Sequence, residues 1–352
     1  MSKRRYLTLP ACVAVLLVLM AGGCRRPESP NERRFLVMGT EASILAAGAD
    51  RSRVDDYARV CMAEMRRLEG ELSIYRPDSQ LSRLNAASGS QVPVGQALRA
   101  LLGLGRYYGE LSRGAFDVTV GPLVRLWGFS GGKTPVGVPG AADIAAAQAR
   151  VGYAGIVTNG LQAGLAQPGM VVDLGGIAKG FAADECCREL QQMGGHNFMV
   201  NLGGNLRCFG APRPGGAWRI GVRDPFHRDQ ILGTLVLTDG QAVASSGNYE
   251  RYVTIAGHRY AHIIDPRTGW PVEGMAGTTV IAPSATAADA LSTTMFVLGI
   301  PEGCAVLKDL RGCAALFVPD RQPLEICVTA SFACCFEPRA DLKDRVHVLA
   351  DE

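Results

Sequence analysis

Helical periodicity is clearest in three stretches of the chain. Across Arg51–Leu68, apolar residues recur about every 3.6 positions, which gathers them on one face of a helix. Gln96–Leu111 repeats this pattern, and a third helix, Ala285–Leu298, is closed by Gly299 and Pro301. Shorter helices are predicted over Ala141–Arg150 and Ala178–Met193.

Short apolar runs predict many strands, and most of them follow one another without a helix between. Such an order favours an α+β fold, in which helices pack on a mixed, largely antiparallel sheet. Three other segments read as a polar loop with a turn of helix (Leu72–Asn85), an irregular apolar stretch (Phe116–Phe129) and a Gly/Pro-rich surface loop (Gly131–Pro139). The predicted strands are Phe35–Ala46, Val171–Leu174, Met199–Leu202, Trp218–Val222, Leu232–Leu237, Ala242–Ser245, Val253–Ile255, His262–Ile264, one ending at Val280–Ile281, Ala314–Val318 and Ile326–Thr329.

Length and composition fit a globular protein. At about 100–200 residues per domain, 352 residues make one large domain or two intimate ones. Apolar residues form 47% of the chain and charged residues 20%, so a chain of this length can bury a stable core without disulfides or structural metal ions. The formal net charge is only +3, and basic residues cluster nowhere beyond the first few positions. We therefore expect no nucleic-acid partner.

The N-terminus has the pattern of an export signal. Basic residues at positions 3–5 precede the apolar run Leu7–Met20, which is shorter than the roughly 20 residues of a membrane-spanning helix. Small residues and Cys24 follow, resembling a bacterial lipobox, although an alanine stands where leucine is commoner. We predict a signal peptide over 1–23, a lipidated Cys24 and a polar tether over 24–34. The alternatives are an ordinary cleaved signal or an uncleaved anchor. Acyl chains would then hold the exported protein on the periplasmic or extracytoplasmic face of a bacterial membrane.

The cysteines allow two interpretations. Nine of the 11 follow Cys24, and five of those lie after residue 300. No C-x-x-C spacing occurs, which argues against a structural zinc site. Exported proteins tend to pair their cysteines, so disulfides are expected in the C-terminal segment. Buried thiols that pack as small hydrophobes are the other interpretation.

A glycine-rich turn is the first candidate for chemistry. Val171–Gly180 runs from an apolar stretch through Asp173 and two glycines to a helix start that carries Lys179. Backbone N–H groups at a helix N-terminus suit an anion, and the lysine adds a charge for a phosphate. The spacing is neither that of a Walker A loop nor that of a dinucleotide-binding fingerprint. The alternative to a ligand-binding role is a structural strand-to-helix turn.

A carboxylate and a hydroxyl on the late helix form the second candidate. Asp289 and Thr293 are four residues apart and so share one face of a largely apolar helix. A carboxylate in such a place needs a partner, and a pair of oxygen ligands suits a hard cation such as Mg²⁺. A hydrogen bond within the helix would explain the pair equally well.

The third candidate is the segment His262–Pro271. His262 could accept a proton near neutral pH, or it could be a structural strand residue. Asp265 precedes a proline and could stabilise a turn. His258 and His262 have a spacing that binds zinc on a helix, but this segment has the pattern of a strand, so zinc is disfavoured.

A set of aromatic and polar residues completes the candidates. Met38, Tyr75, Phe116, Asp117 and Trp127 include groups that stack on flat ligands, although each alone is more often a core residue.

Taken in order, these segments resemble the ApbE family of flavin transferases over about residues 35–320. The segment 331–352 has no counterpart there, so the family domain is predicted over 35–330, followed by a tail of unknown role. The matching segments are Phe35–Glu41, Leu72–Asn85, Gly114–Phe129, Val172–Asp184, Asn201–Gly204, Gly221–Pro225, Ala244–Tyr252, His262–Pro271 and Ala282–Leu298.

The resemblance implies a fold with an FAD cleft between two intimate subdomains. It implies FAD contacts at Met38, Tyr75, Ala115, Phe116, Asp117, Asp173, Lys179 and His262. It also implies Mg²⁺ ligands at Ala178 (through its carbonyl), Asp289 and Thr293, and places His262 and Asp265 beside the diphosphate as the catalytic pair.

The implied reaction is Mg²⁺-dependent transfer of FMN from FAD to a threonine hydroxyl of an acceptor flavoprotein, with release of AMP. The implied acceptors are membrane redox-complex subunits or exported flavoproteins. Hydrolysis of FAD to FMN and AMP at the same site is one alternative. A non-catalytic FAD-binding lipoprotein is another, although a carrier needs neither metal nor base.

Overall fold

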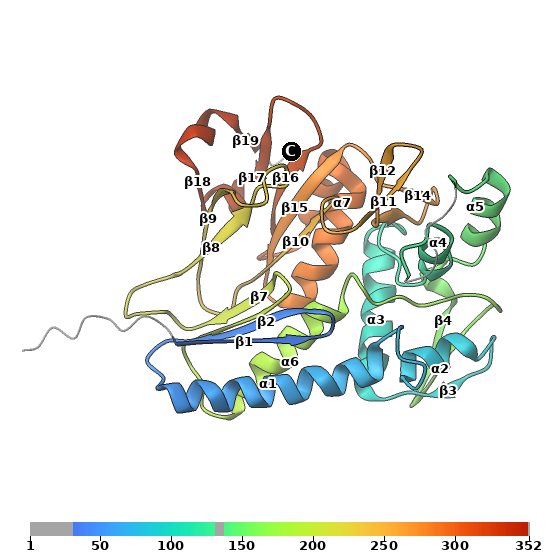
Figure 1. Ribbon diagram of the computed structural model, residues 1–352, viewed down its shortest axis with the longest axis horizontal. Coiled ribbons are helices and arrows are strands. Elements are labelled where there is room, and N and C mark those ends of the chain that lie inside the picture. The colour runs from blue at the N-terminus through green and yellow to red at the C-terminus, as the bar shows by residue number, and fades with distance from the viewer. Residues whose placement is uncertain (1–30, 131–136, 351–352) are drawn as a thin grey trace, which may run out of the picture.

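The protein is described by a computed structural model that covers residues 31–130 and 137–350 (Figure 1). The predicted signal peptide over 1–23, the lipidation residue Cys24 and most of the loop Gly131–Pro139 lie outside the described residues.

A nine-stranded sheet forms the larger part of the fold. Its neighbouring strands are antiparallel except for β17 and β19, which are parallel, so the predicted mixed and largely antiparallel sheet is confirmed. In spatial order the strands are β1 (Asn31–Val37), β2 (Thr40–Ala46), β6 (Phe198–Leu202), β7 (Asn205–Phe209), β10 (Ala242–Gly247), β15 (Met275–Ala282), β16 (Ala314–Pro319), β17 (Ile326–Thr329) and β19 (Val346–Leu349).

Each face of this sheet is covered. Alternate residues of β15 and β16 belong to two separate apolar clusters, as expected when successive side chains point to opposite faces. One cluster packs under α1 (Arg51–Leu72), α6 (Ala178–Gln192) and α7 (Ala285–Leu307), and the other under a small sheet of β18 (Phe336–Pro338), β9 (Ile231–Leu237) and β8 (Trp218–Arg223). By length and composition α7 could cross a membrane, but 56% of its apolar window is buried inside the protein, as in a core helix.

A second group of elements lies beside the sheet, on the right of Figure 1. The large apolar cluster continues into part of this group, and the rest of the group packs around a smaller, separate cluster. Its elements are α2 (Gln80–Ala86), α3 (Gln96–Leu111), α4 (Gly121–Leu126), α5 (Ala141–Gln148), a 3₁₀ turn (η1, Tyr153–Gly155), a sheet of β3 (Val92–Pro93), β5 (Gln162–Leu165) and β4 (Ile156–Asn159), and two hairpins, β11 (Tyr252–Ile255) with β12 (His258–Ala261) and β13 (Ile264–Asp265) with β14 (Trp270–Pro271).

Three predicted elements differ from the structure near the candidate residues. The single strand expected over Phe35–Ala46 is a hairpin, because Met38 and Gly39 have φ angles of 50° and 69° that turn the chain. Val171–Leu174 is not a strand: Val171 forms one isolated bridge with Val120. His262 lies between β12 and β13 instead of inside a strand.

Three further boundaries change. The last helix is interrupted at Gly299 as predicted, because the φ of 70° there is non-helical, but a second helical segment follows directly and runs to Leu307. Strand β1 begins at Asn31, inside the expected tether. The tail after residue 330 is part of the fold, because it contains α8 (Ala330–Ala333), β18, a 3₁₀ turn (η2, Ala340–Arg345) and β19, and both strands join sheets.

The expected C-terminal disulfides are not formed. Cys313, Cys327, Cys334 and Cys335 are free thiols; the alternative of buried thiols fits Cys327, whereas Cys313 and Cys335 are partly buried and Cys334 is exposed. Burial raises the pKa of Cys313 to about 11, as expected for a thiol that packs as a small hydrophobe.

Candidate active site

Helices α6 and α7 touch backbone to backbone at Gly180. The Gly180 N–H donates to Asp289 Oδ2 over 2.9 Å. A β-carbon at position 180 would lie 2.2 Å from the carbonyl oxygen of Ala285, a distance that real β-carbons essentially never show. Glycine is therefore required sterically, and this contact brings the predicted glycine turn and the predicted metal carboxylate together.

The start of α7 is capped by its own Ser284, whose hydroxyl accepts from the Ala287 N–H, and is held against α6 by a carboxylate. Asp184 accepts hydrogen bonds from the N–H groups of Ala285 (2.9 Å) and Thr286 (2.8 Å), and it pairs with Arg207 at 2.8 Å. Asp184 thus acts as a helix cap supplied by another element. The sequence reading did not single out this role, since a cap from another element leaves no local pattern.

Asp289 is a buried carboxylate with one oxygen uncommitted. Its exposed fraction is 5%, and this burial raises its pKa, while Lys179 and the Gly180 N–H act in the opposite direction. Oδ2 is occupied by Gly180, whereas Oδ1 has no hydrogen bond from any residue that the structure describes. An uncommitted carboxylate oxygen on an otherwise buried residue fits a bound cation.

Gly176 is the meeting point of three segments. A β-carbon there would lie 3.2 Å from Phe116 Cε2 and 3.3 Å from Thr293 Oγ1. The turn itself is closed by Asp173, whose Oδ1 accepts from the Gly175 N–H over 2.8 Å. Burial raises the pKa of Asp173, and the Gly175 N–H together with Arg251 and Arg125 opposes this shift. The predicted residues Phe116, Asp173 and Thr293 are therefore brought to one place.

His262 is neutral and has a defined tautomer. Burial lowers its pKa to about 4, and the charges of Arg251 and Lys179 act in the same direction. Its Nδ1 lies 3.2 Å from the Arg251 carbonyl oxygen, which can only accept, so Nδ1 carries the proton and Nε2 keeps a free lone pair. This is the form that a general base needs.

Asp265 is engaged in its own turn. Its carboxylate accepts from the backbone N–H of Arg267 (2.9 Å) and is ion-paired with the guanidinium of the same residue (2.9 Å). Its carbonyl accepts from Thr268 and Gly269. These contacts favour the turn-stabilising alternative for this residue.

The residues predicted for the flavin occupy different settings. Ala115 and Phe116 are buried, and the carboxylate of Asp117 is occupied by Thr119 and by the Tyr153 N–H. Met38 is half-buried at the turn of the β1–β2 hairpin. Tyr75 is 61% exposed in the loop after α1. Its backbone N–H donates to Ser73, and it makes no hydrogen bond to Asp289 among the described residues.

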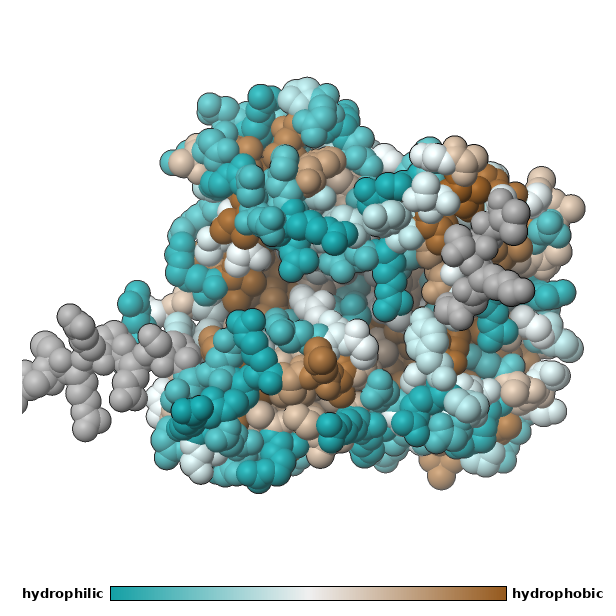
Figure 2. Space-filling view, viewed as in Figure 1, coloured by the Kyte–Doolittle hydropathy of each residue, from teal (hydrophilic) through white to brown (hydrophobic). Residues whose placement is uncertain are grey.

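Trp127, the other aromatic candidate, is a core residue. It is fully buried, its indole N–H donates to the Gly269 carbonyl over 2.9 Å, and it packs on Tyr260 and Trp270. It therefore anchors the segment of His262 to α4. Tyr252 and Trp270 on the two hairpins are exposed. Hydrophobic residues gather at the upper right of the surface shown in Figure 2.

Among the described residues, no three His, Cys, Asp or Glu side chains come together. His258 lies on β12 and contacts Glu273 at 2.9 Å instead of pairing with His262. A cation at Asp289 would thus be held by one carboxylate, a hydroxyl and backbone or substrate oxygens, a ligand set suited to Mg²⁺.

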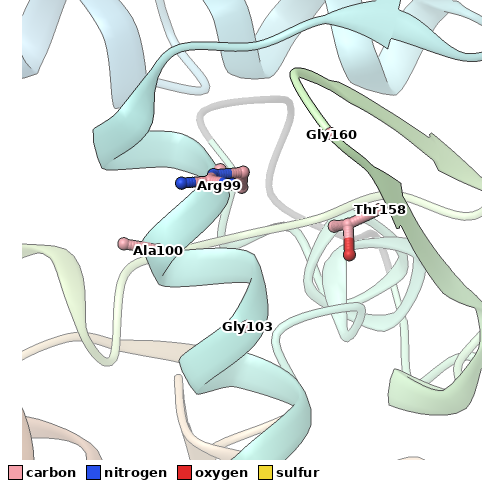
Figure 3. A pocket seen from close by; sticks show the side chains of 5 residues that line it. All are labelled: Arg99, Ala100, Gly103, Thr158 and Gly160. Carbon is pink, nitrogen blue, oxygen red and sulfur yellow. The ribbon is translucent and has the colours of Figure 1, made fainter.

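A shallow hollow of about 300 Å³ lies away from this cluster, between α3 and β4 (Figure 3). It shares no residue with the predicted site. Its lining residues are Arg99, Ala100, Gly103, Thr158 and Gly160.

Comparison with known proteins gives one consistent result. Residues 38–317 match the ApbE family. The chain is 33% identical to an FAD:protein FMN transferase of Klebsiella pneumoniae, over 89% of this chain and 91% of that protein. It is 34% identical to one of Treponema pallidum, over 96% and 95% respectively.

Solved structures agree. The flavin transferase ApbE of Vibrio cholerae superposes with a TM-score of 0.77 at 30% identity, covering 87% of this chain and 99% of that one. An ApbE protein from Thermotoga maritima gives 0.79 at 32% identity, covering 88% and 99%.

Proposed function

This chain belongs to the ApbE family, and on that basis we propose that it transfers FMN from FAD to an acceptor protein. The observation that carries the proposal is the meeting of the glycine turn with α7. Oxygen ligands for a hard cation (Asp289 and Thr293) lie beside that turn, and the charge of Lys179 acts on both Asp289 and His262. A dinucleotide diphosphate needs these three kinds of group together.

We assign the cation as Mg²⁺, held by Asp289, Thr293 and the Ala178 carbonyl. The assignment is supported by the free Oδ1 of Asp289 and by the all-oxygen ligand set. When bound, the ion would neutralise negative charge on the diphosphate.

We propose a threonine hydroxyl as the acceptor. Its oxygen attacks the FMN-side phosphorus, the bond from that phosphorus to the bridging oxygen breaks, and AMP leaves with that oxygen. His262 Nε2 takes the hydroxyl proton, a role supported by its neutral form and its Nδ1–H tautomer. Lys179 at the turn supplies a positive charge for the phosphates. Asp265 acts by shaping the turn that follows His262.

Mass spectrometry of an acceptor protein incubated with the full chain, FAD and Mg²⁺ tests this function. We expect the acceptor to gain the mass of FMN less water, and AMP to appear in equal amount. His262→Ala should bind FAD but lose transfer, and Asp289→Ala should lose the dependence on metal. Appearance of FMN and AMP with an unmodified acceptor would instead identify a hydrolase, and intact FAD would identify a carrier.

We further propose that the protein is exported and anchored by a lipidated Cys24, which would place it beside membrane redox-complex subunits or exported flavoproteins as acceptors. Metabolic labelling with a fatty acid should mark the wild-type chain and leave Cys24→Ala unlabelled. Equal labelling of both proteins would exclude this anchor.

A further inference from the structure

A chain of hydroxyl groups connects β10 to the metal-binding face of α7. Ser246 Oγ on β10 lies 2.9 Å from Ser292 Oγ and 3.3 Å from Thr293 Oγ1. Ser292 Oγ in turn lies 2.9 Å from the carbonyl oxygen of Asp289. The contact with Thr293 is longer than the usual O–H···O distance of about 2.7–2.8 Å. The other two are ordinary hydrogen bonds.

The direction of every proton in this chain follows from its last member. A carbonyl oxygen only accepts, so Ser292 must donate its single hydroxyl proton to the Asp289 carbonyl oxygen. Ser246 must then donate to Ser292, because Ser292 has no second proton to give. Thr293 is left to donate to Ser246, whose own proton is already used.

Thr293 Oγ1 donates to no carbonyl of its own helix among the residues that the structure describes. A threonine in a helix commonly donates to the carbonyl three or four residues earlier. In the described residues the side-chain hydrogen bonds to the carbonyls of Ala290 and Asp289 come from Thr294 (2.8 Å) and Ser292, and the one hydrogen bond of Thr293 Oγ1 is with Ser246. Ser246 is the acceptor that remains for the Thr293 proton.

From this ordering we infer that Ser246 is a positioning residue for the cation site. A hydroxyl binds a cation through an oxygen lone pair, so its proton must point away from the ion. By accepting that proton, Ser246 keeps Thr293 Oγ1 turned with its lone pairs toward the space beside Asp289. The inference rests on the proposed function, since it presumes a cation at Asp289 and Thr293.

The adjacent residue on β10 provides a matched control. The hydroxyl of Ser245 lies 2.9 Å from Thr279 Oγ1 on β15 and makes no hydrogen bond to α7 in the described part of the chain. Replacing either serine by alanine removes one oxygen atom from the same strand. A difference between the two variants therefore reports the contact with α7.

The test is a Mn²⁺ titration of the FAD-loaded full chain, with free Mn²⁺ followed by electron paramagnetic resonance. Ser246→Ala should raise the Mn²⁺ Kd by about 10-fold or more, since loss of a group that orients a ligand typically costs 10–100-fold in metal affinity. Ser292→Ala should act in the same direction, because it frees the Ser246 proton to point at Thr293. The double variant should be no worse than the worse single one.

The structural readouts should stay constant. The urea midpoint of the metal-free protein and its affinity for FAD without metal should match between Ser246→Ala and Ser245→Ala. Equal Mn²⁺ affinity in these two variants would overturn the inference, even where Asp289→Ala abolishes binding and so supports the metal site. If the wild-type chain binds Mn²⁺ no better than Asp289→Ala, both the proposed metal site and the role of Ser246 are wrong.

Discussion

The closest backbone approach in the site gives the sharpest prediction, the effect of Gly180→Ala. The new β-carbon would lie 2.2 Å from the Ala285 carbonyl oxygen and 2.8 Å from Asp289 Cβ. Relief requires a shift of about 0.8 Å, from 2.2 to 3.0 Å. Because the nearest atom is backbone, no side chain can rotate away, and α7 itself must move.

That movement works against two fixed contacts. The Asp184 cap holds the first residues of α7, and the Gly180 N–H holds Asp289 at 2.9 Å, so a shift of this size breaks or stretches at least one of them. Overpacking of a tight contact costs about 1–3 kcal/mol in the free energy of unfolding. A lost hydrogen bond to a buried carboxylate adds about 1.5–3 kcal/mol. We expect Gly180→Ala to lose at least about 2 kcal/mol.

The control is Gly70→Ala in α1, where a β-carbon would meet nothing within 4 Å. Alanine is favoured over glycine inside a helix by about 0.5–1 kcal/mol, so this variant should be more stable than wild type. Urea unfolding of the metal-free proteins measures both changes. If Gly180→Ala proves as stable as Gly70→Ala, the close approach of α6 and α7 is wrong, and the convergence behind the proposed site is lost.

Three further predictions concern the same region. Asp184→Ala should destabilise the protein by about 2–3 kcal/mol, because it removes a helix cap and also leaves Arg207 without its carboxylate. The ordinary cap substitution Asp50→Ala should cost only about 1 kcal/mol. Urea unfolding compares the two variants, and equal losses of stability would contradict the bridging role of Asp184. Gly176→Ala should change stability by less than about 1 kcal/mol, because its β-carbon would lie 3.2 Å from Phe116 and 3.3 Å from Thr293, which need to shift only slightly. It should still weaken Mn²⁺ binding, because it displaces Thr293. Unchanged Mn²⁺ affinity would place Thr293 outside the metal site. The His262 imidazole should titrate near pH 4 in proton NMR of the protein without FAD or metal, since its folded-state pKa is about 4, below the ordinary 6.5. The unfolded chain binds this proton more readily than the folded protein does. The contribution of His262 to stability is therefore complete above about pH 6.5 and is lost as the pH falls toward 4. A resonance that titrates near 6.5 would contradict the lowered pKa of His262.

Local patterns predicted the helices of the site well. Gln96–Leu111 begins and ends where its periodicity indicated, and the predicted helix at residue 178 starts at Ala178. The failures occurred where a tertiary contact decides the conformation. Val171–Leu174 has the composition of a buried strand, but its backbone hydrogen bonds go elsewhere. The side-chain amide of Asn85 pairs with both the N–H and the carbonyl of Val172, and the backbone N–H of Asp173 donates to the Val118 carbonyl.

The resemblance identified the family, but local pattern could not show how the site is built. No three His, Cys, Asp or Glu side chains come together in the described residues, and much of this site is backbone. Gly180 and Gly176 let α7 approach closely enough for Asp289 to bond an N–H and for Thr293 to reach the turn. Asp184 holds the start of α7 against α6, and the hydroxyl order from Ser292 to Ser246 fixes where the Thr293 proton points. Asp289 and Thr293, the side chains that would bind the ion, are therefore positioned by residues that do not contact the ion themselves. Substitutions at these supporting positions should separate metal affinity from FAD affinity, which Asp289→Ala alone cannot do, because it removes a ligand and a buried charge at once.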